Sequence, residues 1–422
     1  MEKLGEYKLS VNRLVSLRNG LIEPHIDEKI RRGKVDHVPP QLYEKLKISV
    51  RKFQNLNDNM CFDNYICALK SICSTIEEIG FIPTVDFIIQ SNLIETCINE
   101  INYPSYIESP KICIKILFLL SCSSDFCQIM LDNSFTALFF RLYSNGSSLS
   151  VRNYYLKTLY NILLDCSEKY ISDISMINQL FVLFSNSEYT EMVCSFNILY
   201  LYAIKFDDSE LWDHFLGIIK SKQLFQIKDQ HKFLLRLAHI YINQNIFSLD
   251  QFESVGLKDF VLKHLFEFPD YVLQIAISMF KKGFGLIQLD ILTEFLSGEW
   301  DDKKISTYQS IFAFFTIIIE EKLCELNDII INKLLDFVIF NSEDSLSVLK
   351  QSFEWFLLSL LLSSYSSLVS DQCFHFIISF LSDIISIHNA EDDIISKYRL
   401  GSDTFPISFP QYEWNTLFSL IP

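Results

Sequence analysis

The stretch of sequence that decides the fold runs from Lys111 to Asp165. It opens with the apolar segment KICIKILFLLS (Lys111–Ser121) and the polar break CSSD (Cys122–Asp125). A second amphipathic segment, FCQIMLDNSFTALFFRLYSN (Phe126–Asn145), precedes SLSVRNYYLKTLYNILLDCSE (Ser148–Glu168), where the pattern begins again. A unit of this kind cannot bury its own apolar face, so it must stack on a copy of itself. The stretch therefore predicts consecutive helical repeats.

The pattern recurs along most of the chain at steps of about 40 residues, a spacing typical of armadillo or HEAT repeats. Polar breaks that predict turns separate the apolar segments at 144–148, 206–210, 297–304 and 340–345. We therefore predict an all-α, right-handed α-solenoid over residues 58–390. A linker and an aromatic cap for the last repeat are expected over 391–422.

The composition supports a helical interpretation. The 422 residues are 49% apolar and include 37 Phe and 19 Tyr, which is ample material for a continuous core. Glycine (11) and proline (10) are scarce, whereas a β-sandwich or barrel needs turn residues at short intervals. The most apolar segments, Ser352–Tyr365 and Ile311–Ile319, are shorter than the roughly 20 residues of a membrane span.

The first residues, MEKLGEYKLSVNR, lack the apolar core of a secretory signal. The 11 cysteines are therefore expected to be reduced thiols, and the protein is expected in the cytoplasm, the nucleus or both. No catalytic cluster, phosphate-binding loop, metal site or cofactor site stands out in the sequence, so we expect a protein without enzymatic activity.

Charge is unevenly distributed. Residues 1–53 hold 12 Lys/Arg against 7 Asp/Glu, whereas the remainder holds 24 against 45. The acidic remainder argues against nucleic acid as a partner. Residues 1–57 are expected to form a basic, partly disordered arm whose docking residues are Lys29, Arg31, Arg32 and Lys34. This arm could dock on an acidic partner, fold back on the acidic repeats, or remain solvated.

Two segments resemble the inter-helix turn of armadillo repeats: Val85–Ile98 and Cys127–Leu142. That turn usually carries glycine, because its tight bend tolerates a positive φ. Asn92 and Ser134 stand near this place, and a later segment keeps Gly256. Val151–Asp165 resembles the long third helix that lines an armadillo groove.

The most specific resemblance, over Ile82–Asp165, is to importin-α, the nuclear-import adaptor, and the basic arm resembles the importin-β-binding segment of that family. The resemblance implies a protein that binds extended peptide cargo in a concave groove and importin-β through its arm. In that family, groove helices carry Trp and, four residues later, Asn. These positions fall on Ile114 and Phe118, Lys157 and Asn161, Asn197 and Leu201, and Leu235 and His239.

Only Asn161 keeps the residue of that family, and Lys157 would repel a basic peptide. The candidate groove contacts are Lys115, Asn161, Asn197 and His239. The alternative function is a structural or regulatory scaffold subunit that binds through apolar helix faces, such as Ile311–Ile319 or Phe353–Leu362.

Overall fold

The computed structural model describes residues 39–55, 62–79, 86–144, 147–165, 174–186, 188–206, 209–220, 228–246, 248–298, 301–341 and 347–381. Every regular element in these ranges is a helix, which confirms the all-α class. The described residues fall into two compact units. The N-terminal unit comprises those within 39–218 and 228–233, and the C-terminal unit comprises 219–220 and those within 234–381.

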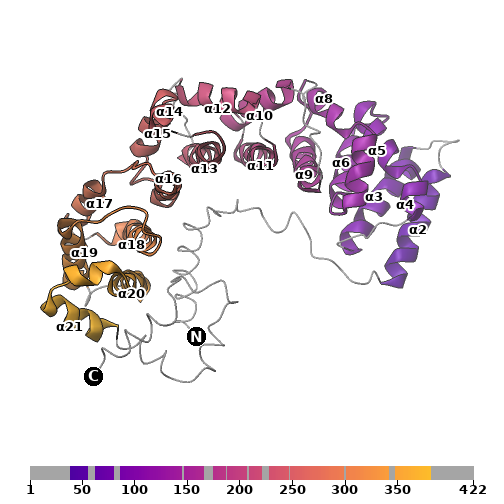
Figure 1. Cartoon of the computed structure of the whole chain (residues 1–422). Coiled ribbons are helices and arrows are strands. Elements are labelled where there is room, and N and C mark those ends of the chain that lie inside the picture. The colour runs from indigo at the N-terminus through magenta and orange to yellow at the C-terminus, as the bar shows by residue number, and fades with distance from the viewer. Residues whose placement is uncertain are drawn as a thin grey trace. The chain divides into compact units, whose positions relative to one another are not determined.

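The helices of the N-terminal unit follow one another in chain order (Figure 1). They are α2 (Pro40–Gln54), α3 (Phe62–Ile79), α4 (Asp86–Gln90), α5 (Leu93–Asn102), α6 (Ser109–Leu120), α7 (Ser124–Asp132), the 3₁₀ turn η2 (Phe135–Ala137), α8 (Leu138–Ser144), α9 (Leu149–Asp165), α10 (Ile174–Asn186), α11 (Tyr189–Lys205) and α12 (Ser209–Lys220). The first residues of α13 (Lys228–Asn245) also belong to this unit.

Packing in the N-terminal unit runs between helices close in sequence. The helices α3, α6, α9 and α11 form a row, here called the α3 row, in which each helix packs on the next. The helices α5 and α10 pack on α6 and α11, respectively. Aromatic rings fill the space between packed elements. Phe135 of η2, for example, stacks on Tyr155 of α9, with ring centroids 4.9 Å apart. Each such buried side chain contributes about 2 kcal/mol through removal of apolar surface from water.

The amphipathic helix expected after Pro40 is α2. It buries Leu46, Val50 and Phe53 against the unit and packs on α3. This helix lies inside the range expected for the basic arm, so the arm's last third is a packed helix. The docking residues Lys29, Arg31, Arg32 and Lys34 lie outside the described residues, as does the expected cap over 391–422.

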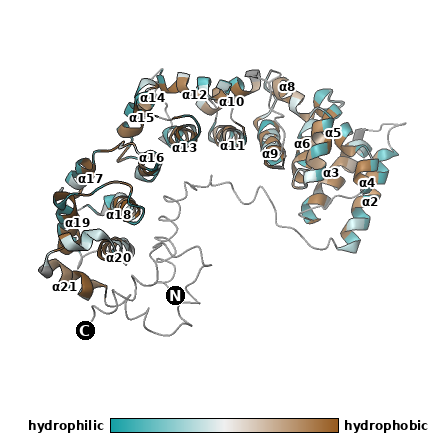
Figure 2. Ribbon diagram, in the orientation of Figure 1, coloured by the Kyte–Doolittle hydropathy of each residue, from teal (hydrophilic) through white to brown (hydrophobic). Residues whose placement is uncertain are grey.

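The C-terminal unit repeats the arrangement. Its elements are the rest of α13, α14 (Leu249–Ser254), α15 (Leu257–Lys263), α16 (Pro269–Lys281), α17 (Leu289–Leu296), η3 (Asp302–Lys304), α18 (Ile305–Glu320), α19 (Asp328–Asn341), α20 (Ser347–Leu362), η4 (Ser364–Leu368) and α21 (Asp371–Phe380). A row of α16, α18 and α20 packs in sequence order, and α17 packs on α19. In Figure 2 the helices carry both hydrophobic (brown) and hydrophilic (teal) residues, as amphipathic helices do.

Three inter-helix turns have the backbone conformation expected from the sequence. Asn92 between α4 and α5 has φ 53°, Ser134 between α7 and η2 has φ 60°, and Gly256 between α14 and α15 has φ 78°. A positive φ costs an asparagine or serine more than a glycine, since only glycine lacks a Cβ. The repeated left-handed turn thus fixes the angle between the two short helices in each of these repeats.

The apolar faces named for the scaffold alternative are core. All residues from Ile311 to Ile319 in α18 are buried, as are those from Ser352 to Leu361 in α20. A helix that is apolar all round is buried on most sides, which is what these two helices show. They are therefore not docking surfaces. Among the described residues, no helix combines the length and the apolar character that a membrane crossing requires.

Candidate functional site

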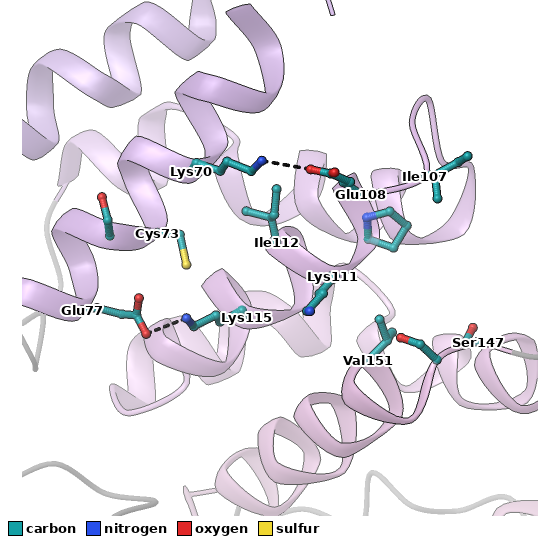
Figure 3. Close-up of a pocket in the computed structure, with 13 residues that line it drawn as sticks. Lys70, Cys73, Glu77, Ile107, Glu108, Lys111, Ile112, Lys115, Ser147 and Val151 are labelled. Carbon is teal, nitrogen blue, oxygen red and sulfur yellow. Dashed lines mark hydrogen bonds and ion pairs between the residues drawn. The ribbon is translucent and has the colours of Figure 1, made fainter. Parts of the chain in front are cut away.

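One depression in the N-terminal unit lies across α3 and α6 and reaches the start of α9 (Figure 3). We call it the α3–α6 pocket, and its volume is about 770 Å³. It is lined by Lys70, Cys73, Ser74, Glu77, Ile107, Glu108, Pro110, Lys111, Ile112, Lys115, Ser147, Ser148 and Val151. The lining therefore combines apolar residues with lysines, glutamates and hydroxyl groups.

Two ion pairs cross the pocket. Lys70 Nζ lies 2.9 Å from Glu108 Oε2, and Lys115 Nζ lies 2.6 Å from Glu77 Oε1. In the first pair α3 provides the lysine and Glu108, just before α6, provides the carboxylate. In the second pair α3 provides the carboxylate and α6 provides the lysine, and the two dashed lines in Figure 3 mark these pairs. All four side chains remain between 29% and 60% exposed, so a ligand could reach them.

The ion pair sets the charge of Lys115. Partial burial opposes the charged form, but the hydrogen bond with Glu77 and the nearby negative groups outweigh it, so the pKa of Lys115 is raised. At the pocket wall, burial raises the pKa of the Cys73 thiol to about 11, even though Lys115 acts in the opposite direction. At neutral pH this thiol stays protonated, and the thiolate is the nucleophilic form of cysteine.

A buried glutamate holds one rim of the pocket in place. Glu100 Oε1 accepts hydrogen bonds from the Ser105 amide (2.6 Å) and the Ser109 hydroxyl (2.5 Å). Its Oε2 accepts from Tyr65 (3.2 Å) and from the Ser105 hydroxyl (3.0 Å). Four donors compensate the cost of burying this carboxylate. They also fix the connection between α5 and α6, which places Ile107 and Glu108 at the pocket edge.

Lys111 differs from the other two lysines of the pocket. Among the described residues it forms no ion pair, and its side chain is exposed. In Figure 3 its ammonium lies beside the Glu77–Lys115 pair, between Lys115 and Val151. The hydroxyl groups of Ser74, Ser147 and Ser148 belong to the same lining. The pocket therefore has one uncompensated positive charge among hydrogen-bonding groups.

The α3 row continues beyond the pocket onto α9 and α11. Phe118 of α6 packs on Tyr154 of α9, with ring centroids 5.5 Å apart. Arg152 forms a bidentate ion pair with the buried Glu191 of α11. Its Nε lies 2.7 Å from Oε1, and its Nη2 lies 3.3 Å from Oε2. Lys157 is half-buried and has no ion-pair partner among the described residues.

The four predicted groove residues occupy different environments. Lys115 lines the pocket. Asn161 is fully buried, and its amide donates to Ser121 Oγ at 2.9 Å. Asn197 is 7% exposed on α11. His239 lies in the C-terminal unit and is 8% exposed. The pocket thus contains one of the four, and their role in peptide binding stays a prediction.

Other residues of the pocket were not singled out from the sequence. Lys70, Glu77, Glu108 and Lys111 each look like an ordinary solvated charge in a helical segment. A signal was nevertheless present, because both ion pairs join residues 38 positions apart, close to the repeat period. Opposite charges one period apart indicate contacts between neighbouring repeats.

Comparisons with known proteins give little more. No protein-family model matches the chain, and no curated protein matches it. Among solved structures, a crystal structure of an engineered protein from the Northeast Structural Genomics Consortium is similar to it. The identity is 13%, the TM-score is 0.47, and the match covers 92% of this chain and 96% of that one. A likeness this weak carries no argument about function.

Proposed function

We propose that this chain is a non-catalytic, peptide-binding protein of armadillo type that takes an extended segment of a partner protein along its α3 row. The observation that carries the proposal is the α3–α6 pocket. It crosses neighbouring helices of the row and is lined by apolar residues together with accessible polar groups. Sites that hold extended peptides need both features, since the apolar surface supplies affinity and the polar groups fix the register.

The distances suit an extended ligand. Packed helices lie about 8 to 10 Å apart, and an extended chain advances about 3.3 Å per residue. A peptide that runs across the row therefore passes from one helix to the next in about three residues. The pocket spans α3, α6 and the start of α9, so it would accommodate about six residues.

The armadillo type is part of this proposal. It is supported by the left-handed turns at Asn92, Ser134 and Gly256, and by contacts between residues about 40 positions apart. More specifically, we propose an adaptor similar to importin-α. Such an adaptor shuttles between cytoplasm and nucleus and binds importin-β through its arm. The scaffold alternative lacks its expected docking faces, because α18 and α20 are buried.

The proposal is tested by selection from a displayed library of unstructured peptides on the purified full chain. Peptides enriched on the unmodified protein are expected to lose binding to Ser74→Trp, which places a large side chain at an exposed position of the pocket lining. The matched control is Ser254→Trp on α14. Both serines are exposed, and both hydroxyls donate to the carbonyl three residues earlier, at 3.1 Å and 2.9 Å. If the peptides are enriched equally on both variants, the α3–α6 pocket is not their binding site.

A further inference from the structure

We infer that the peptide taken by the α3–α6 pocket carries an Asp or Glu side chain whose carboxylate pairs with Lys111. This inference rests on the proposed peptide-binding function and names the chemistry of the ligand. It is opposite in charge to the basic cargo that the importin-α resemblance implies. The net charge of the whole chain is −16, and that value does not predict a preference for an acidic ligand.

The charges of the pocket carry the argument. Its lining holds Lys70, Lys111 and Lys115 against Glu77 and Glu108. Both glutamates are engaged by the other two lysines, at 2.9 Å and 2.6 Å. Lys111 is thus the charge left over, and an anionic ligand group would compensate it. A cationic side chain would be repelled by Lys111. Both accessible carboxylates of the pocket are already paired with lysines, so neither would offset that repulsion.

The place of Lys111 on its helix points the same way. It stands in the first turn of α6, where the one acidic group at the helix start, N-cap Glu108, is already paired with Lys70. The amide dipoles at the start of a helix disfavour a cation there. A carboxylate bound beside Lys111 would interact favourably with both the ammonium and the helix. The hydroxyl of Ser147 would supply a neutral donor to the same group.

The next helix of the row, α9, also carries a lysine, Lys157, that has no ion-pair partner among the described residues. Its positive charge partly offsets the effect of burial, which raises the pKa of the Cys194 thiol in α11. The other cation of α9 near the row, Arg152, is neutralised by Glu191. Lys157 is therefore a second uncompensated lysine on the helix next to the pocket, which favours a ligand with more than one acidic residue.

The experiment is fluorescence anisotropy with the full chain and three labelled peptides that alternate alanine with glutamate, glutamine or lysine. We expect the glutamate peptide to bind most tightly and to weaken as ionic strength rises. Lys111→Glu should weaken that binding by about tenfold or more, because a charge-assisted hydrogen bond is lost and a repulsion is gained. Lys111→Arg should retain it.

The control variant is Lys220→Glu, which makes the same charge change at an exposed position on α12. It should change the affinity less than twofold. Preference for the lysine peptide, or equal effects of the two charge reversals, would overturn the acidic-ligand inference. The inference also fails if none of the three peptides binds. Peptides selected from the library that remain sensitive to Ser74→Trp would then keep the proposed function intact.

Discussion

Buried polar side chains join neighbouring repeats at the scale of single residues. The amide of Asn161 donates to Ser121, His239 lies 2.8 Å from Ser278 Oγ, and Ser310 donates to Asp270. The partners are 40, 39 and 40 positions apart. A buried polar group without a partner is costly, so each of these pairs favours one register between two repeats.

His239 should make stability depend on pH. Burial lowers its pKa to about 4, whereas an unfolded histidine titrates near 6.5. Above pH 6.5 both states are neutral at this group. As the pH falls from about 6.5 to about 4 the unfolded chain takes up the proton first, so stability decreases, by about 3 kcal/mol in total.

Urea unfolding of the unmodified chain and of His239→Gln, across this pH range, measures the effect. The difference between the two stabilities should shrink or reverse as the solution becomes more acidic. Carboxylates that titrate elsewhere affect both proteins alike and cancel in that difference. Parallel pH profiles for the two proteins would contradict the prediction.

At the scale of elements, lysines at the ends of helices satisfy the carbonyl groups of the preceding helix in the row. Lys205, in the last turn of α11, donates to the carbonyls of Leu163 and Leu164 in α9, at 2.6 Å and 2.7 Å. The last carbonyls of a helix have no partner within it and carry partial negative charge. A cation from the next repeat therefore caps the helix and attaches the repeats to each other.

Lys282 provides the same cap in the C-terminal unit, and its removal should be costly. Its ammonium donates to the carbonyls of Ile242 (2.5 Å), Asn243 (3.0 Å) and Ile246 (2.7 Å), and burial lowers its pKa. Lys282→Met keeps most of the aliphatic stem and should destabilise the protein by about 1.5 to 3 kcal/mol.

The adjacent Lys281 is the matched control. It pairs with Glu321 at 3.0 Å on a more exposed surface, with 39% of its side chain accessible. Lys281→Met should therefore cost less than about 1 kcal/mol. Chemical denaturation of both variants compares them, and a loss for Lys282→Met no larger than that for Lys281→Met would refute the capping role.

At the scale of the whole molecule, the strongest packing joins elements close in sequence, as α3 with α6, α6 with α9, and α18 with α20. Stability in such a protein is approximately a sum of terms for each repeat and for its contacts with its neighbours. A local defect should therefore stay local, in contrast to a globular domain with one core.

Hydrogen exchange measured by mass spectrometry tests this. Leu117→Ala removes a fully buried side chain of α6, at a cost of about 2 to 5 kcal/mol. It should accelerate exchange in α3, α6 and α9 and leave α16, α18 and α20 nearly unchanged. Leu273→Ala in α16, also fully buried, should give the mirror image. Equal acceleration throughout the chain by either variant would contradict local stability.

The helices, their breaks and the period near 40 residues can be predicted from the amino-acid sequence alone, and the resemblance to armadillo repeats indicated where left-handed turns could stand. These features depend on local physics: apolar periodicity, turn residues and the steric freedom of the backbone. The break at 144–148, for example, separates α8 from α9, and the break at 206–210 separates α11 from α12.

Only the tertiary structure decided which polar groups meet. It paired Glu77 with Lys115 rather than leaving it solvated, buried Asn161 and His239, and left Lys111 as the uncompensated charge of the pocket. The physical reason is register. Apolar periodicity states which face of a helix is buried, but a small rotation or shift against the neighbouring repeat decides which side chains near the edge of that face are covered and which are exposed.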